Sequence, residues 1–157
     1  MPSKSKGKII LAVGLPGSGK STYFARRDIH PLSSDTLRLW LLGDETDQSQ
    51  QHQIFVALRS LLRIRLLLGL PHNYVDATNL TPKERRPYIL MAKRYGYEME
   101  AIFFDVPTEV CRRRNQDRKR RVPEDAMERM AAKLRPPTLE EGFRKIVVVK
   151  SGRGRQA

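Results

Sequence analysis

Gly14-Leu15-Pro16-Gly17-Ser18-Gly19-Lys20-Ser21 is the stretch that decides the fold, because it fills the pattern G-x-x-x-x-G-K-[ST] of a phosphate-binding loop. The apolar segment 8–13 before it predicts a buried strand, and residues 22–27 after it can continue as a helix. Glycines let backbone N–H groups curl around a phosphate, and the helix N-terminus adds its positive dipole end. A glycine turn that binds nothing is the alternative, and the complete pattern between a strand and a helix argues against it.

This loop predicts a site for a nucleoside triphosphate and its metal. The Lys20 ammonium would neutralise charge on the β- and γ-phosphates, and the Ser21 hydroxyl would hold Mg²⁺. The residues predicted to bind the cofactor here are Gly14, Pro16, Gly17, Ser18, Gly19, Lys20, Ser21 and Thr22. The chain has no Asn-Lys-x-Asp motif for reading guanine, which argues against a GTPase.

Composition predicts a globular protein that binds a polyanion. The chain has 157 residues, which suits one domain, and its 30 basic against 17 acidic residues give a net charge of +13. Such an excess favours a nucleic-acid partner, the alternative being a merely solubilising surface. The single cysteine, Cys111, cannot form an internal disulfide. With no signal peptide or membrane span in the sequence, we expect a cytoplasmic protein that does not bind membranes.

Strands are predicted to alternate with helices along the whole chain. The expected strands are 8–13, 32–34, 73–77, 98–106 and 145–149, and the expected helices are 19–27, 35–42, 54–66, 81–95, 108–118 and 123–134. Apolar strands in such an alternation indicate an α/β fold with a parallel sheet covered on both faces. We take residues 1–157 as one domain with flexible basic ends, 1–7 and 151–157. Trp40 and Phe55 are expected in the core, although an aromatic near Arg38 could stack on a base.

Two acidic residues follow predicted strands at the edge where ligands gather in α/β sheets, Asp35 and Asp76. If Asp35 caps its helix, Arg38 lies one turn on and can face the same pocket. A carboxylate there can accept an alcohol proton while the arginine holds a substrate phosphate. The competing interpretation makes Asp35 only an N-cap. Asp76 is expected to support the site. It could instead be the general base, or bind Mg²⁺ through water. The competing explanation for Asp76 and Asn79 is that they only shape the turn after a strand.

A run of cations forms the third element of the predicted site. Arg112, Arg113, Arg114, Arg118, Lys119, Arg120 and Arg121 fall within ten positions. Such a run is either a solvated face or an Arg-rich lid that closes over the transferring phosphoryl group. Arg114 and Arg118 are four apart, so on a helix they would point the same way, and we expect them to face inward. The others would meet solvent or nucleic-acid backbone.

The chain resembles the 5′-kinase domain of phage and bacterial polynucleotide kinases. The resemblance covers nearly the whole chain and rests on the order and spacing of several pieces. They are Gly14 to Thr22, Ser34-Asp35-x-x-Arg38, Asp76-Ala77-Thr78-Asn79, Glu84-Arg85-Arg86, Phe104-Asp105-Val106-Pro107, Arg114-Asn115-x-x-Arg118 and Val122-Pro123. The phosphate loop is generic, whereas the later pieces are more specific. The phosphatase or ligase domains that those enzymes often carry have no room in this chain.

The resemblance implies the P-loop kinase strand order 2-3-1-4-5 and ATP- and Mg²⁺-dependent transfer to the 5′-hydroxyl of DNA or RNA in repair or processing. It implies catalytic roles for Lys20, Asp35, Arg38 and Arg118, with Asp35 as the general base. Asp35, Arg38, Asp76 and Asn79 would bind the substrate, Ser21 the metal, and Arg114 and Arg118 the ATP phosphates. Two alternatives stay open: a kinase of a small alcohol-bearing metabolite or antibiotic, and a nucleotide-gated nucleic-acid-binding module.

Overall fold

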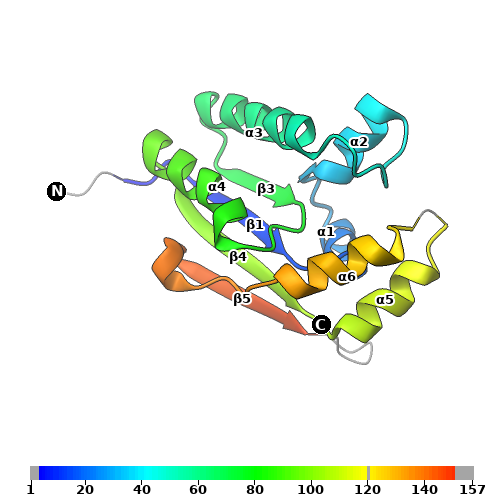
Figure 1. Ribbon diagram of the computed structural model, residues 1–157. Helices are drawn as coiled ribbons and strands as arrows, with labels where there is room; N and C mark the ends of the chain where they lie inside the picture. The colour runs from blue at the N-terminus through cyan, green and yellow to red at the C-terminus, as the bar shows by residue number, and fades with distance from the viewer. Residues whose placement is uncertain (1–3, 120, 151–157) are drawn as a thin grey trace.

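A computed structural model describes residues 4–119 and 121–150, and Figure 1 shows strands and helices alternating along the chain. The strands are β1 (Lys8–Val13), β2 (Leu32–Ser33), β3 (His72–Asp76), β4 (Glu98–Asp105) and β5 (Lys145–Lys150). The helices are α1 (Lys20–Arg26), α2 (Ser34–Leu42), α3 (Gln51–Leu67), α4 (Pro82–Tyr95), α5 (Thr108–Gln116), α6 (Glu124–Lys133) and the 3₁₀ turn η1 (Leu139–Glu141). The predicted end 151–157 lies outside the described residues, as do residues 1–3.

The five strands form one parallel sheet in the order β2-β3-β1-β4-β5, which confirms the predicted fold class and strand order. The first strand lies in the centre, with Ile9 opposite Asn73 on one side and opposite Met99 on the other. All carboxyl ends therefore meet at one edge of the sheet, and the loops that follow them form the site. Among the described residues, no helix is both long and apolar enough to cross a membrane.

Alternation along β1 places its side chains on both faces of the sheet. Ile9, Leu11 and Val13 belong to the core shared with α3 and α4, which contribute residues such as Leu62 and Tyr88. On the opposite face, the neighbouring β1 side chains pack with Phe24 of α1. Burial of both faces explains why the strand reads as a continuous apolar run.

The structure corrects two expectations about α2. Its N-cap is Ser33, whose hydroxyl accepts the Thr36 N–H at 3.2 Å, so Asp35 lies in the first turn and is not the cap. Trp40 is 70% exposed and therefore not a core residue, because α2 buries Leu37 and Arg38 on its inward side. Phe55 is partly buried and lines the site, so only part of that expectation was right.

Arg85 ties the loop after β3 to the C-terminal part of the chain. Its guanidinium is fully buried and binds both carboxylate oxygens of Glu141, at 2.8 and 3.0 Å, from α4. It also donates to the backbone carbonyls of Asn79 and Arg135. These bonds hold the turn that shapes one wall of the site against the segment before β5.

Arg85→Met is expected to lower the free energy of unfolding by about 3–5 kcal/mol, because it leaves two backbone carbonyls without their Arg85 donor and removes the cation paired with the largely buried Glu141 carboxylate, which keeps only its bonds from Thr138. Urea denaturation measures this. Arg129→Gln is the control, since it breaks the exposed Arg129–Asp125 pair and should cost about 1 kcal/mol or less. An Arg85→Met variant as stable as the control would show that the buried pair does not hold the fold.

Candidate active site

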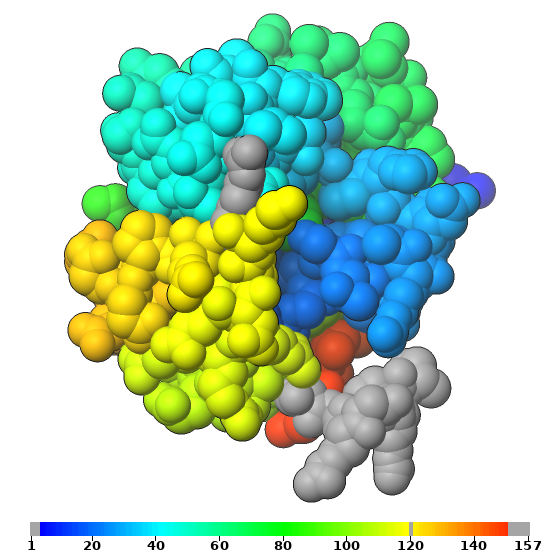
Figure 2. Space-filling model, turned by 90° about the vertical axis from the view of Figure 1, so that its right-hand side faces the viewer, coloured from blue at the N-terminus to red at the C-terminus, as the bar shows by residue number. Residues whose placement is uncertain are grey.

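A cleft of about 1850 Å³ opens at the carboxyl edge of the sheet. Figure 2 looks onto this edge, where the molecule is hollowed between the cyan α2–α3 part and the yellow α5–α6 part, with the blue phosphate loop and α1 beside the hollow. The walls come from the phosphate loop, the first turns of α2 and α3, residues 76–81, and the α5–α6 region. The cleft therefore joins all the segments in which the sequence places chemistry.

The phosphate loop has the backbone that a bound phosphate requires. Gly17 and Gly19 have φ values of 84° and 98°, which residues other than glycine rarely adopt. The Lys20 ammonium is buried and donates to the carbonyls of Gly14 and Leu15, both at 2.9 Å. Burial lowers the pKa of Lys20, whereas the carboxylates of Asp76 and Asp35 raise it.

A Cβ atom on Gly17 would lie 2.5 Å from the carbonyl oxygen of Cys111 in α5. The loop thus packs directly on α5, and Arg114 of that helix donates to the Gly17 carbonyl at 3.3 Å. The Ser18 hydroxyl is buried and has no hydrogen-bond partner among the described residues. Such an orphaned polar atom in the loop fits a site that is completed by phosphate oxygens.

The Ser21 hydroxyl donates to the Asp76 carboxylate at 3.0 Å and joins the start of α1 to the end of β3. Burial raises the pKa of Asp76, and the Lys20 ammonium and the Ser21 hydrogen bond lower it. A hydroxyl beside a carboxylate provides hard oxygen ligands, which suit Mg²⁺. The described residues contain no group of three His, Cys, Asp or Glu side chains that could hold a metal, so water and phosphate would complete its coordination.

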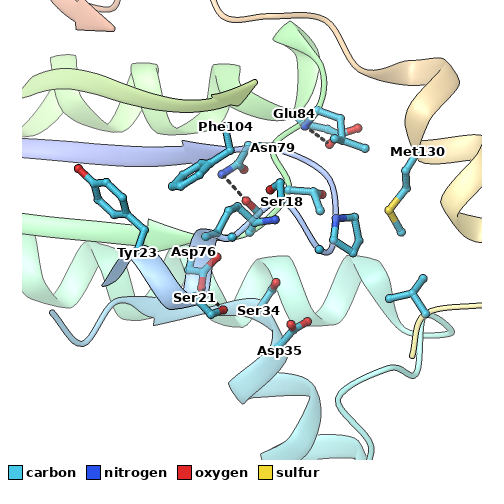
Figure 3. A pocket seen from close by; sticks show the side chains of 18 of the residues that line it. Ser18, Ser21, Tyr23, Ser34, Asp35, Asp76, Asn79, Glu84, Phe104 and Met130 are labelled. Carbon is cyan, nitrogen blue, oxygen red and sulfur yellow. Dashed lines mark hydrogen bonds between the residues drawn. The ribbon is translucent and has the colours of Figure 1, made fainter. Parts of the chain in front are cut away.

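Asp35 and Arg38 meet in the cleft, as their spacing predicts. Arg38 is buried, and its Nη1 donates to the Asp35 carboxylate at 3.0 Å and to the Ser34 hydroxyl at 3.3 Å. Its Nη2 donates to the Gln51 side chain, which approaches from α3. Figure 3 shows Ser34 and Asp35 on the side of the cleft nearest Ser21. A half-exposed carboxylate beside a fixed guanidinium is suited to accept a proton from a hydroxyl bound next to a phosphate.

Asn79 also lies at the cleft, on the wall shown above Ser18 in Figure 3. Its side-chain nitrogen donates to the Ala12 carbonyl of β1 at 2.8 Å, and its φ of 46° is unusual for a residue other than glycine. The side chain is almost fully buried. This geometry gives Asn79 a role in holding the loop after β3, while its predicted contact with substrate stays a prediction.

The two predicted lid arginines both line the cleft, but they do not share a helix. Helix α5 ends at Gln116, and Arg118 follows in a turn whose N–H donates to the Asn115 carbonyl at 3.2 Å. The prediction that one helix carries both Arg114 and Arg118 was therefore wrong. Burial is the largest effect at the centre of the site, where it lowers the pKa of Lys20 and raises the pKa of Asp76. The Arg118 charge is a smaller effect that lowers both pKa values.

Sequence reasoning missed a group of side chains that line the part of the cleft away from the phosphate loop. They are Gln48, Gln51, His52, Phe55, Arg59, Lys83, Pro87, Met130 and Lys133. They come from the loop before α3 and from α3, α4 and α6, and Figure 3 shows Met130 facing the cleft from the side opposite Tyr23. Polar residues in helices far apart in sequence carry no common motif, so only the fold reveals that they share a wall. Phe55 was noted, but as a core residue.

A family model described as an AAA domain, AAA_33, matches residues 9–137. The chain belongs to this family. The family match, with the similarity to a chain of the Pnkp1/Rnl/Hen1 complex, places the chain among the P-loop kinases, which bind ATP. Other solved structures of the same fold include several small kinases.

In the structure of the Pnkp1/Rnl/Hen1 complex, a chain is 25% identical with a TM-score of 0.59, over 72% of this chain and 40% of that one. A chain in the structure of the Pnkp1/Rnl/Hen1 RNA repair complex is 24% identical, with a TM-score of 0.69, over 84% and 45%. The present chain thus spans less than half the length of these two relatives.

Two small-molecule kinases share the fold. The Mycobacterium tuberculosis APS kinase CysC is 19% identical with a TM-score of 0.59, and the alignment covers 98% of this chain and 92% of that one. A gluconokinase from Sinorhizobium meliloti is 17% identical with a TM-score of 0.60, over 96% and 86%. These two similarities show the shared fold, and the names of the relatives point to different acceptors.

Proposed function

We propose that this AAA_33 chain is an ATP- and Mg²⁺-dependent polynucleotide 5′-hydroxyl kinase that acts on DNA or RNA ends in repair or processing. The observation that carries the proposal is the Asp35–Arg38 pair, joined at 3.0 Å on the cleft wall near Ser21 and Asp76. It gives the site an acceptor side as well as a donor side. We also propose a cytoplasmic location, because a single cysteine fits a reducing compartment.

In the proposed reaction, the Asp35 carboxylate accepts the proton of the 5′-hydroxyl as its oxygen bonds to the γ-phosphorus of ATP. The bond from that phosphorus to the bridging oxygen breaks, and ADP leaves. Arg38 holds the phosphate next to the acceptor nucleoside and orients the hydroxyl for in-line attack. Lys20, Arg114 and Arg118 balance the negative charge on the phosphates during transfer.

Ser21, supported by Asp76, would hold the Mg²⁺ ion, which when bound neutralises charge on the β- and γ-phosphates. Burial of Asp76 beside the Lys20 ammonium keeps the pair in a water-poor part of the cleft, where charge interactions are strong. Because the Ser21 hydroxyl directs its proton to Asp76, its oxygen lone pairs would be available to the metal.

Three observations favour a polynucleotide over a small alcohol. The net charge is +13, far above what a small acceptor needs. Arg59 and Lys83 also line the cleft, so it offers cations besides Arg38 for further phosphates of a longer acceptor. The similarity to the Pnkp1/Rnl/Hen1 complex, at 25% identity, adds support. The second structure of that complex is described as an RNA repair complex.

Replacing Arg59 and Lys83 by glutamine is expected to raise the KM for an oligonucleotide about tenfold. The slope of log affinity against log salt concentration should fall by about one for each cation removed, because each would neutralise one phosphate. The KM for a nucleoside 3′-monophosphate should change little, because its single phosphate lies at Arg38. Lys93→Gln, an exposed change on α4 outside the cleft, is the control. Equal effects on the long and the short acceptor would argue against an extended strand along the cleft.

The proposal is tested by incubating the protein with γ-labelled ATP, Mg²⁺ and matched 5′-hydroxyl DNA and RNA oligonucleotides, beside a panel of alcohol-bearing metabolites and aminoglycosides. Label on the oligonucleotides is expected. Transfer confined to a small acceptor would support a metabolite or antibiotic kinase. ATP-dependent oligonucleotide binding without any transfer would support a nucleotide-gated binding module.

A further inference from the structure

Asn115, between the two cleft arginines Arg114 and Arg118, is 1% exposed. Its side-chain nitrogen donates to the carbonyl of Val122 at 2.8 Å, and its side-chain oxygen accepts the N–H of Val122 at 3.0 Å. The Asn115 amide therefore pairs with both the backbone N–H and the backbone carbonyl of Val122, as a residue of a neighbouring strand would. This clamp joins the last turn of α5 to the residue before Pro123, the N-cap of α6.

We propose that Asn115 is a positioning residue for phosphoryl transfer, which places Arg118 toward the ATP phosphates by fixing both ends of the segment that carries it. The inference rests on the proposed function, in which Arg118 acts on those phosphates. It concerns a residue that touches no reacting atom and works through Arg118. The Arg118 N–H donates to the Asn115 carbonyl, so the same residue holds the arginine through its backbone as well.

The clamp is also anchored beneath the phosphate loop. Val122 packs in a buried cluster with Leu15 of the loop, Leu80 and Cys111. Since Gly17 also packs against the Cys111 carbonyl, α5, the loop and Val122 form one packed unit. The position of Arg118 is consequently set relative to the loop that would bind the phosphates.

Another contact across the same joint is an ion pair at 2.6 Å between Arg112 of α5 and Glu124 of α6. The Arg112 Nε is buried, but the Glu124 side chain is 46% exposed, so water and salt screen the pair from that side. The Asn115 bonds are buried and cannot be replaced by water without opening the joint. This contrast identifies the buried amide as the element that fixes the segment, and it supplies a matched control.

A double-mutant cycle tests the inference, with single-turnover transfer from ATP to a 5′-hydroxyl oligonucleotide as the readout. Asn115→Leu keeps the branched shape and the number of side-chain heavy atoms and removes both bonds, and Asn115→Asp keeps only the bond from the Val122 N–H. We expect each to lower the transfer rate at least about tenfold in the wild-type background and to change it less than about twofold when Arg118 is already glutamine. Glu124→Gln, which breaks the exposed ion pair, should leave the rate within about twofold of wild type.

Effects that multiply in the double variants would overturn the inference, because they would show that Asn115 acts independently of Arg118. If Asn115→Leu does not fold, Asn115→Asp carries the same cycle, with ATP binding and the melting temperature measured for every variant. An Arg118→Gln enzyme with wild-type turnover would overturn the inference and leave 5′-kinase activity intact. A wild-type chain that transfers no label to any oligonucleotide would overturn the proposed function and this inference with it.

Discussion

Asp35→Asn is expected to lower the rate of phosphoryl transfer by about 10²- to 10⁴-fold, the usual contribution of a positioned general base. Asparagine keeps the size of the side chain and can still accept the bond from Arg38. It cannot take the proton of the acceptor hydroxyl. Because Asp35 lies on α2 and outside the phosphate loop, ATP should bind this variant within about threefold of wild type.

The measurement is the single-turnover rate with saturating ATP and acceptor, alongside ATP affinity. Asp28→Asn is the matched control, since Asp28 is an exposed carboxylate in the turn after α1 and does not line the cleft. A variant of Asp35 with near-normal turnover would mean that another group accepts the proton. Asp76 is the other carboxylate held beside Lys20, and Asp76→Asn would then be the variant to compare.

Arg118→Gln is expected to lower the transfer rate by about 10³-fold, the smaller end of the effect of an arginine that stabilises phosphoryl transfer. The reason is geometric, because Arg118 lines the cleft and its charge already acts on Lys20 and Asp76. The charge matters most when negative charge spreads over the transferring group. ATP binding should fall much less than the rate.

Lys119→Gln provides the neighbouring control, since Lys119 is exposed and does not line the cleft. At saturating acceptor its rate should stay within about twofold of wild type. Equal losses in the two variants would show that the segment contributes only diffuse positive charge. A rate for Arg118→Gln close to wild type would contradict a direct role in transfer.

The sequence predicted the donor side of the site because the phosphate loop is local. Its glycines, Lys20 and Ser21 lie within eight consecutive residues, and each requirement is met by chain neighbours. The sheet was predictable for a related reason, since strands buried on both faces read as apolar runs. Asp35 and Arg38 could be paired because three positions along a helix face the same side.

The remaining features depend on contacts between distant parts of the chain. Gln51 reaches Arg38 from another helix, and nothing in the spacing of 13 residues marks the pair. Asn115 stands in a run of arginines that looks like a solvated surface, yet the fold buries it against Val122. Arg118 was assigned to a helix because periodicity does not show where a helix of polar residues ends. Trp40 was assigned to the core because of its residue type. Other residues, Leu37 and Arg38 among them, already fill the inward face of α2, so Trp40 lies on the outside.

Transfer of the γ-phosphate to a free 5′ end is the most direct test of the proposed function. Two oligonucleotides of one sequence, one with a 5′-hydroxyl and one with a 5′-phosphate, are incubated with labelled ATP and Mg²⁺. We expect label on the 5′-hydroxyl strand alone, all of it released by a phosphatase that removes terminal phosphates. Equal labelling of both strands, or none on either while a small alcohol is phosphorylated, would contradict it.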